Sequence, residues 1–345
     1  MAVVSRFVPD NPLYSETCIA EYFAGSLLLA DEVHDLILDL LVKDFASPEG
    51  IPKIYVDAEQ GNFQGSASYV VLVSSGENQL VAQYRKHNHR LDSQVMETAY
   101  ECYGDWVPRV KIYDSKDWQI LFSPYAGLSY ALQQNSYTYD ERANAVRDYA
   151  TFAAQSCFKA REPDPCEVQD IRQKLATWAT WKLNDEVSHM MKEAYINSSR
   201  PLEDFAETVG CLFSLPMVFT HGDVGNGTNI LSDASGHITG VIDWGESTWK
   251  PFGFGLLGLE IFLGCMGDQG YILVERHEDL CDLFWEAMWE NMPSSIKEKR
   301  QELEKPVKLA KTVGTLFCFL SYYSNEGQVS DFDLEFMRGR LVHLF

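Results

Sequence analysis

Apolar and polar positions follow two different periods along this chain, and the change of period separates a helical start, a strand-rich part and a helix-rich part. Between Gly25 and Val42 apolar residues recur at helical spacing around four aspartate and glutamate residues, which predicts an amphipathic helix with an acidic outer face. From about Pro52 onward, short runs rich in Val, Leu, Ile and Tyr are separated by Gly and Ser, which predicts a small antiparallel sheet. Its expected strands are 54–56, 67–73, 79–84, 107–110 and 119–122, with a helix over 92–103 before the fourth.

After a linker at about 123–127, helical spacing dominates the rest of the chain. The expected helices are 139–160, 168–195, 202–213, 278–291 and 306–323. Strands followed by helices predict an α+β protein with a small antiparallel β-sheet N-lobe and a larger, mainly helical C-lobe. We expect a helical extension over residues 1–50, a β-rich lobe over 51–125 and a helical lobe over 126–345.

Composition narrows the function further. The 345 residues include 46% hydrophobic side chains and carry a formal net charge of -22, so the chain can bury a large core but lacks the basic surface of a nucleic-acid binder. Eight cysteines without a C-x-x-C pair favour buried thiols in a reducing compartment over a zinc site or a disulfide framework. No signal peptide and no membrane span are expected, so we predict a cytoplasmic protein. The oligomeric state stays open.

One stretch carries most of the chemical information, namely His221-Gly-Asp223 followed by Asn229-Ile-Leu and then Val-Ile-Asp243-Trp. It predicts a glycine-rich loop followed by a hairpin that turns near Ser235 and delivers a second aspartate. Two carboxylates and an amide oxygen brought together this way suit Mg²⁺, which prefers oxygen ligands. Each residue taken singly could equally cap a turn or end a strand. The whole ordered set favours a metal site.

This motif resembles the catalytic region of the aminoglycoside phosphotransferase and choline kinase family, small-molecule kinases with a protein-kinase-like fold. The sequence from Gly236 to Trp244, followed by Pro251-Phe-Gly-Phe-Gly-Leu256 and Leu259-Glu260, is similar to a fungal branch of that family. The resemblance implies a two-lobed fold that binds ATP and Mg²⁺ in the cleft. It implies that Asp223 accepts or orients the proton of the attacking hydroxyl, that His221 braces the loop, and that Asn229 and Asp243 hold Mg²⁺ against the nucleotide phosphates.

The chain departs from the family pattern in the catalytic loop and in the strand that should bind phosphate. Five residues separate Asp223 from Asn229 where the family has four, so either the loop bulges at Asn229 or Asn226 takes its place; we favour Asn229 because Ile230-Leu231 follows it directly. The strand position of the usual phosphate-binding Lys holds Gln83. Arg85 lies two residues on, on the same face, and is the best replacement, with Lys86 the weaker option.

The remaining expected nucleotide contacts are weaker signals. Glu97 occupies the place of the helix glutamate that would pair with the phosphate-binding cation, and it could equally be a surface carboxylate. Gly65 and Ser66 belong to a loose phosphate-covering loop without P-loop spacing.

We therefore expect a kinase of a small-molecule hydroxyl, with a natural-product or cationic metabolite as acceptor. The alternative is a catalytically idle or repurposed member of the fold, which the Gln83 replacement favours; a metal-dependent hydrolase is a weaker option. Acceptor-site candidates by location are the residues that follow the loop: Trp244, Glu246, Trp249, Glu260 and the helix over 285–289. For the tryptophans a core position is the more common outcome.

Overall fold

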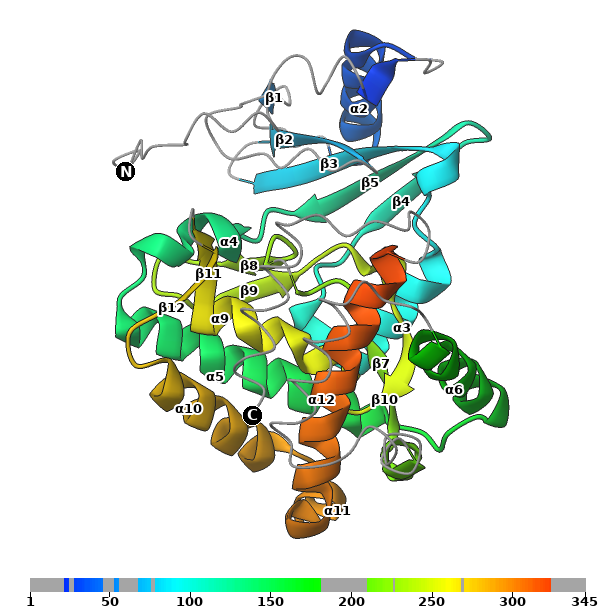
Figure 1. Cartoon of the computed structure of the whole chain (residues 1–345). Coiled ribbons are helices and arrows are strands. Elements are labelled where there is room, and N and C mark those ends of the chain that lie inside the picture. The colour runs from blue at the N-terminus through cyan, green and yellow to red at the C-terminus, as the bar shows by residue number, and fades with distance from the viewer. Residues whose placement is uncertain are drawn as a thin grey trace. The chain divides into compact units, whose positions relative to one another are not determined.

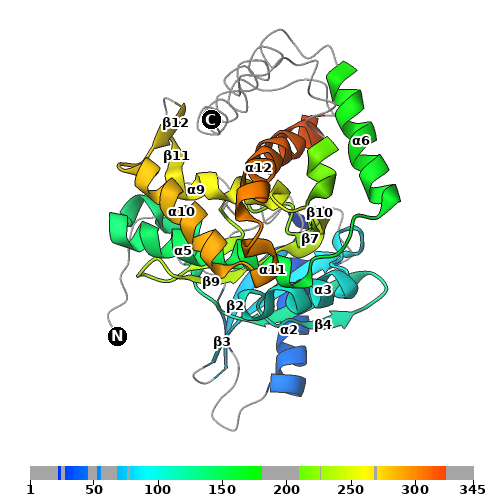
Figure 2. The same cartoon turned by 90° about the horizontal axis from the view of Figure 1, so that it is seen from below.

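The computed structural model of the chain is shown in Figure 1 and Figure 2. It describes residues 22–24, 28–45, 53–55, 68–75, 78–180, 210–225, 227–267 and 270–323. The chain divides into two compact units: unit 1 takes in the described residues up to Met96 together with Pro108–Leu128, and unit 2 takes in Glu97–Val107 and the described residues from Ser129 onward. Each unit is described by itself. No helix among the described residues is long and apolar enough to cross a membrane.

Unit 1 is built on a five-stranded antiparallel sheet with the order β1-β2-β3-β5-β4. Its strands are β1 (Lys53–Tyr55), β2 (Tyr69–Ser75), β3 (Asn78–Lys86), β4 (Lys111–Asp114) and β5 (Trp118–Pro124). The strand expected at 107–110 is wrong. Val107 closes a 3-10 turn by donating its N–H to the Gly104 carbonyl, and Pro108 has no N–H for a ladder, so pairing starts only at Lys111.

Helix α2 (Ala30–Phe45) covers one face of this sheet and confirms the helix predicted from the acidic amphipathic stretch. Val33, Ile37 and Leu41, spaced four residues apart, are fully buried in the same apolar cluster as side chains of β2, β3 and β5. In β3 this cluster includes Ala82 and Tyr84. Because side chains alternate along a strand, Gln83 and Arg85 lie on the opposite face of the sheet.

Helix α3 (Ser93–Tyr103) begins in unit 1 and continues into unit 2, where most of the helices lie. Among the described residues, the other helices of unit 2 are α4 (Tyr130–Gln133), α5 (Tyr139–Gln155), α6 (Pro165–Thr180), α9 (Glu260–Leu263), α10 (His277–Asn291), α11 (Ser294–Lys297) and α12 (Arg300–Tyr323). The predictions near 139–160 and 278–291 are confirmed. The last predicted helix starts six residues early, at Arg300, and Pro306 lies inside it. Helix α6 confirms the predicted helix over 168–195 as far as Thr180, and the rest of that helix lies outside the described residues. Of the helix predicted over 202–213, residues 202–209 lie outside the described residues, and Cys211–Ser214 form a 3-10 turn.

A buried aromatic core joins α5 to its neighbours. In both views α10 runs beside α5 (Figure 1 and Figure 2). The ring of Tyr149 on α5 stacks on Phe284 of α10, with 5.7 Å between ring centres, and lies tilted 5.1 Å from the ring of Phe262 of α9. Helix α5 begins at a capping box, in which the Thr138 hydroxyl accepts from the Glu141 N–H and the Glu141 carboxylate accepts from the Thr138 N–H.

The short strands that follow β5 lie in unit 2, apart from Leu128, and those between Met217 and Pro251 carry the loop and hairpin of the sequence motif. They are β6 (Leu128–Ser129), β7 (Met217–Thr220), β8 (Ile230–Ser232), β9 (Ile238–Val241), β10 (Thr248–Pro251), β11 (Gly264–Gly267) and β12 (Gly270–Leu273). They form the sheets β6-β8-β9, β10-β7 and β11-β12. The seven described cysteines are free, and buried thiols are confirmed for Cys102 and Cys157, whereas Cys166 is exposed in the first turn of α6.

Candidate active site

The candidate catalytic loop follows β7 and lies against the turn that follows Asp243. Strand β7 pairs with β10, so the chain segments next to these strands are held together: the Ser247 hydroxyl donates to the His221 carbonyl at 3.1 Å. At Gly222, φ is +85° and an added Cβ would lie 2.3 Å from the Glu246 carbonyl oxygen, so only glycine fits. The structure thus brings the His221–Asp223 loop beside residues 243–246.

His221 is a buried connector within this loop. Its Nδ1 accepts the Asp223 N–H at 3.2 Å, so its Nε2 carries the proton and donates to the Ile242 carbonyl at 2.7 Å. Burial lowers the pKa of His221 to about 4, so the imidazole is neutral at physiological pH. Its ring also lies 4.6 Å from that of Trp244. These bonds tie the backbone of Asp223 to the residue before Asp243, a role in positioning.

Asp223 is partly buried and held by an amide. Asn229 donates through Nδ2 to the Asp223 carbonyl at 2.8 Å and to its Oδ2 at 3.0 Å. The pKa of Asp223 is raised to about 6: burial is the largest cause, the charges of Asp243 and Glu246 act in the same direction, and the Asn229 hydrogen bond opposes them. A carboxylate with a pKa near 6 can take up a proton from a substrate hydroxyl near neutral pH.

Asp243 is exposed and has an unusual backbone conformation. With φ 62° and ψ 63° it is in the left-handed region, where among the described residues only Arg276 joins it as a non-glycine. Such a conformation is uncommon for a residue other than glycine and gathers at functional sites. The sequence could not have predicted this conformation, although aspartate tolerates it better than most residues.

Asn229 and Asp243 stand at the open end of the same hairpin. The Ile242 N–H donates to the Asn229 carbonyl at 2.9 Å, which continues the β8–β9 pairing by one step. Asn229 is 8% exposed. Asn226, the alternative to Asn229, lies outside the described residues.

The donor set fits a magnesium ion. Two mutually repelling carboxylates and an amide gather here, and Mg²⁺ binds through one or two carboxylates plus substrate phosphates and water. No cluster of three or more His, Cys, Asp or Glu that could hold a metal ion is present among the described residues. Asn229 and Asp243 are the residues that would hold the ion.

In unit 1 the structure separates the two basic candidates of β3. Lys86 lies on the α2 face, where its Nζ contacts the Tyr22 carbonyl and stands 4.5 Å from the centre of the Tyr22 ring. Arg85 shares the opposite face with Gln83, is 4% exposed, and donates through Nη1 to the His89 carbonyl at 3.3 Å. This placement favours Arg85 over Lys86 as the replacement cation.

The other expected nucleotide contacts stay predictions. Glu97 is exposed on α3 and falls in unit 2, whereas Arg85 falls in unit 1. Gly65 and Ser66 lie outside the described residues.

Several acceptor-site candidates have structural partners instead. Trp244 and Trp289 are fully buried, and the Trp244 indole N–H donates to the Val241 carbonyl at 2.9 Å. Glu260 is completely buried and forms an ion pair with Lys311 of α12. Of the candidates named from the sequence, Glu246 is exposed and its charge acts on Asp223. Nothing in the sequence links Glu260 to Lys311, because 51 residues separate them.

Comparison with known proteins gives one family match and several structures with a similar fold. The profile of the phosphotransferase enzyme family matches residues 131–261. No curated protein matches the chain. Solved structures with a similar fold include choline kinase from Cryptosporidium parvum Iowa II, with 15% identity and a TM-score of 0.52 over 90% of this chain and 94% of that one. Aminoglycoside phosphotransferase APH(4)-Ia has 15% identity and a TM-score of 0.51 over 90% and 98%.

A third similar structure is the macrolide 2′-phosphotransferase from Brachybacterium faecium, with 14% identity and a TM-score of 0.50 over 89% of this chain and 98% of that one. These likenesses show the α+β, protein-kinase-like fold, and the family match includes the whole stretch from His221 to Asp243. The resemblance to the aminoglycoside phosphotransferase and choline kinase family is therefore confirmed over residues 131–261.

Proposed function

We propose that this protein transfers the γ-phosphate of ATP, with Mg²⁺, to a hydroxyl group of a small molecule. The observation that carries the proposal is the arrangement of Asp223, Asn229 and Asp243, which one loop and one hairpin bring together in unit 2. A thermostable variant of APH(4)-Ia with a TM-score of 0.50 was solved as a ternary complex with AMP-PNP and hygromycin B, which supports a nucleotide and a small acceptor for this fold.

In this mechanism Asp223 is the residue that acts on the acceptor. Above a pH of about 6 its carboxylate is ionised and can orient the acceptor hydroxyl and accept its proton. The Asn229 amide fixes the carboxylate, and His221 fixes the backbone that bears it. When bound, the metal ion supplies charge neutralisation to the phosphates.

The acceptor class follows from charge. The chain carries 50 acidic and 28 basic residues, and exposed Glu246 adds a third negative charge beside Asp223 and Asp243. Such a field attracts cations and repels anions. We therefore propose a cationic or neutral acceptor, such as a natural product or a metabolite bearing an amine.

Thermal unfolding with and without nucleotide tests the proposal. ATP with Mg²⁺ at 100 times its dissociation constant should stabilise the protein by about 2.7 kcal/mol. Asp243→Ala should lose the part of this shift that depends on Mg²⁺, whereas Asp223→Ala should keep the shift and lose turnover. Glu290→Ala, which changes an exposed carboxylate on α10, is the matched control and should behave like the wild type. Full activity of Asp243→Ala on an identified acceptor would refute the mechanism.

A second candidate is a kinase-fold protein that binds ligands or catalyses a different biosynthetic step. Gln83 favours it, because an amide at the usual Lys position cannot supply positive charge to the phosphates. Replacing Arg85 by Gln separates the two functions: we expect loss of nucleotide affinity if Arg85 replaces the Lys. No shift of wild-type unfolding with ATP and Mg²⁺ would support the second candidate.

A further inference from the structure

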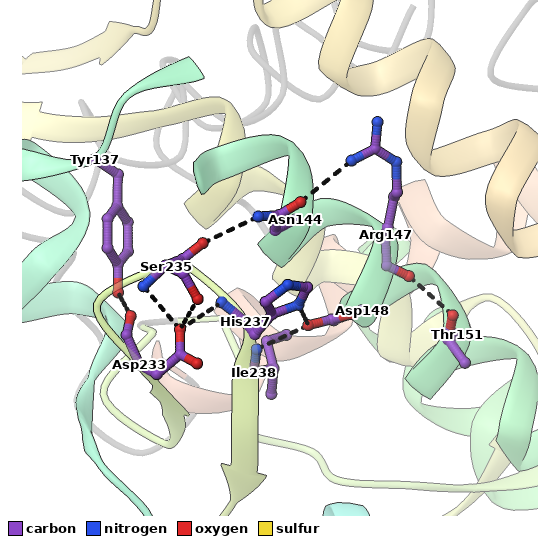
Figure 3. Close-up of polar contacts among 9 residues, drawn as sticks. All are labelled: Tyr137, Asn144, Arg147, Asp148, Thr151, Asp233, Ser235, His237 and Ile238. Carbon is purple, nitrogen blue, oxygen red and sulfur yellow. Dashed lines mark hydrogen bonds and ion pairs between the residues drawn. The ribbon is translucent and has the colours of Figure 1, made fainter. Parts of the chain in front are cut away.

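A stripe of polar residues along α5 forms hydrogen bonds with the turn of the β8–β9 hairpin (Figure 3). The stripe is formed by Tyr137, Glu141, Asn144 and Asp148, whose spacing of three and four residues places them on one side of the helix and its entry. The Tyr137 hydroxyl donates to the Asp233 carbonyl at 2.7 Å, and the Asn144 amide donates to the Ser235 carbonyl at 3.1 Å. Both side chains thus bind main-chain carbonyl groups of the turn.

Asp148 contacts the start of β9. Its Oδ2 accepts the main-chain N–H of Ile238 at 2.9 Å and the Nδ1–H of His237 at 2.8 Å. Ile238 is the first residue of β9, so this carboxylate fixes the start of the strand that leads to Asp243. Asp148 lies 90 residues before Ile238 in the sequence and outside the motif that carries the catalytic residues.

The turn itself is shaped to fit against the helix. The Asp233 Oδ1 accepts from the Ser235 N–H at 2.9 Å and the His237 N–H at 3.0 Å, which closes the turn internally. Gly236 has φ +82°, and an added Cβ would lie 2.0 Å from the Glu141 carbonyl oxygen. A turn that is rigid and in contact with the helix backbone cannot shift along α5 without losing these bonds.

The opposite end of the hairpin carries the proposed metal ligands. Strands β8 and β9 are only three and four residues long, and a register shift lies between Leu231 and Ser232. At about 3.3 Å per residue, Asp243 is within roughly 16 Å of Ile238 along the strand direction. A short hairpin held at its turn therefore transmits the position of α5 to Asn229 and Asp243.

We propose that Asp148 is a positioning residue for the metal site: it holds β9 at Ile238 and so sets the spacing between Asn229 and Asp243. This inference rests on the proposed function, because it assumes that these two residues bind the ion. It assigns to α5 a part in metal binding without any contact between that helix and the ion.

The test compares Asp148→Ala and Asp148→Asn with the wild type and with Asp140→Ala and Asp140→Asn. Asp140 is exposed in the first turn of the same helix, so its variants repeat the chemical change away from the stripe. Calorimetry measures the dissociation constant of Mn²⁺–AMP-PNP and, in EDTA, that of AMP-PNP alone. Electron paramagnetic resonance of the bound Mn²⁺ reports the ligand geometry, and urea unfolding reports the stability.

We expect Asp148→Ala to weaken Mn²⁺–AMP-PNP binding by about tenfold, the lower range found when groups that orient metal ligands are removed. Its affinity for AMP-PNP in EDTA should be unchanged, and its Mn²⁺ spectrum should differ from that of the wild type. Asp148→Asn keeps an oxygen that can accept the Ile238 N–H, so its dissociation constant for Mn²⁺–AMP-PNP should lie between those of the wild type and Asp148→Ala. Both Asp140 variants should match the wild type.

Wild-type metal affinity in Asp148→Ala, or equal weakening with Mn²⁺ and in EDTA, would overturn the inference and leave the proposed function intact. If Asp148→Ala does not fold, Asp148→Asn and Asn144→Ala test the inference in the same assay: wild-type metal affinity in both would overturn it. If the wild type itself binds AMP-PNP no better with Mn²⁺ than in EDTA, the proposed function fails, and the positioning role fails with it.

Discussion

Replacing Asp223 by Asn should stabilise this protein at neutral pH while it removes turnover. Burial and the charges of Asp243 and Glu246 disfavour the ionised form of Asp223, which raises its pKa from 3.8 to about 6. The ionised Asp223 side chain therefore lowers the free energy of unfolding. Asparagine has nearly the same shape, carries no charge, and keeps an oxygen that can accept the Asn229 N–H.

The sign and the size of the effect follow from linkage. A carboxyl group whose pKa is higher in the folded protein binds protons more tightly there, so its ionisation destabilises the fold as the pH rises. Below pH 3.8 both states are protonated and the cost is absent; above pH 6 it is complete. Each pKa unit corresponds to about 1.4 kcal/mol, so the cost reaches at most about 3 kcal/mol at pH 8 and about half of that at pH 5.

Urea unfolding of the wild type and Asp223→Asn at pH 5 and pH 8 measures this difference directly. We expect Asp223→Asn to be more stable at both values, with a gain at pH 8 about twice that at pH 5. Asp140→Asn is the control for the loss of one negative charge from an acidic protein, and its effect should be small at both values. Equal gains at the two values would refute the assigned pKa, and a loss of stability would show that the Asp223 charge is compensated.

The remaining predictions concern buried groups in unit 2. The lowered pKa of His221, about 4, means that the unfolded chain binds a proton between pH 4 and 6.5 that the folded chain does not, so stability falls as the pH drops through that range. His221→Gln should remove this acid sensitivity in urea unfolding at pH 5 and 7 and should lower kcat; an unchanged pH dependence would contradict the assignment. Lys311→Met leaves the Glu260 carboxylate buried without its cation and should cost about 3 to 5 kcal/mol. Glu260→Gln added to Lys311→Met should recover part of that loss in a double-mutant cycle, and strict additivity would show that the pair is not coupled.

The periodicity of apolar residues was sufficient to predict the helices and strands that bury one face. Helix α2 buries Val33, Ile37 and Leu41, which are among the apolar positions that recur at helical spacing in this stretch. The prediction failed at 107–110, where apolar character suggested a strand and a 3-10 turn with Pro108 delayed pairing until Lys111. The apolar residues there favour a strand, but Pro108 has no N–H to donate to a neighbouring strand, so no strand forms.

The motif residues could be selected from the sequence, but the groups that hold them could not. The partner of His221 is the main-chain carbonyl of Ile242, which has no sequence signature. The contact between Asp148 and Ile238 spans 90 residues, and Asp148 has no feature that separates it from other helix-surface carboxylates. Alternation along β3 predicted correctly that Arg85 shares a face with Gln83, because it depends on the strand alone.

The site combines repulsion between carboxylates with rigid support, and this combination supports the proposal that a cation binds there. Asp243 and Glu246 both raise the pKa of Asp223, so the fold holds negative charges closer together than they would lie in free chain. The His221–Ile242 and Asn229–Asp223 hydrogen bonds oppose that repulsion by fixing the backbone on both sides. A divalent cation that binds only the folded protein would convert the repulsion into attraction and raise the free energy of unfolding through mass action. The proposed metal site therefore predicts that stability rises with Mg²⁺ in the wild type and does not rise in Asp243→Ala.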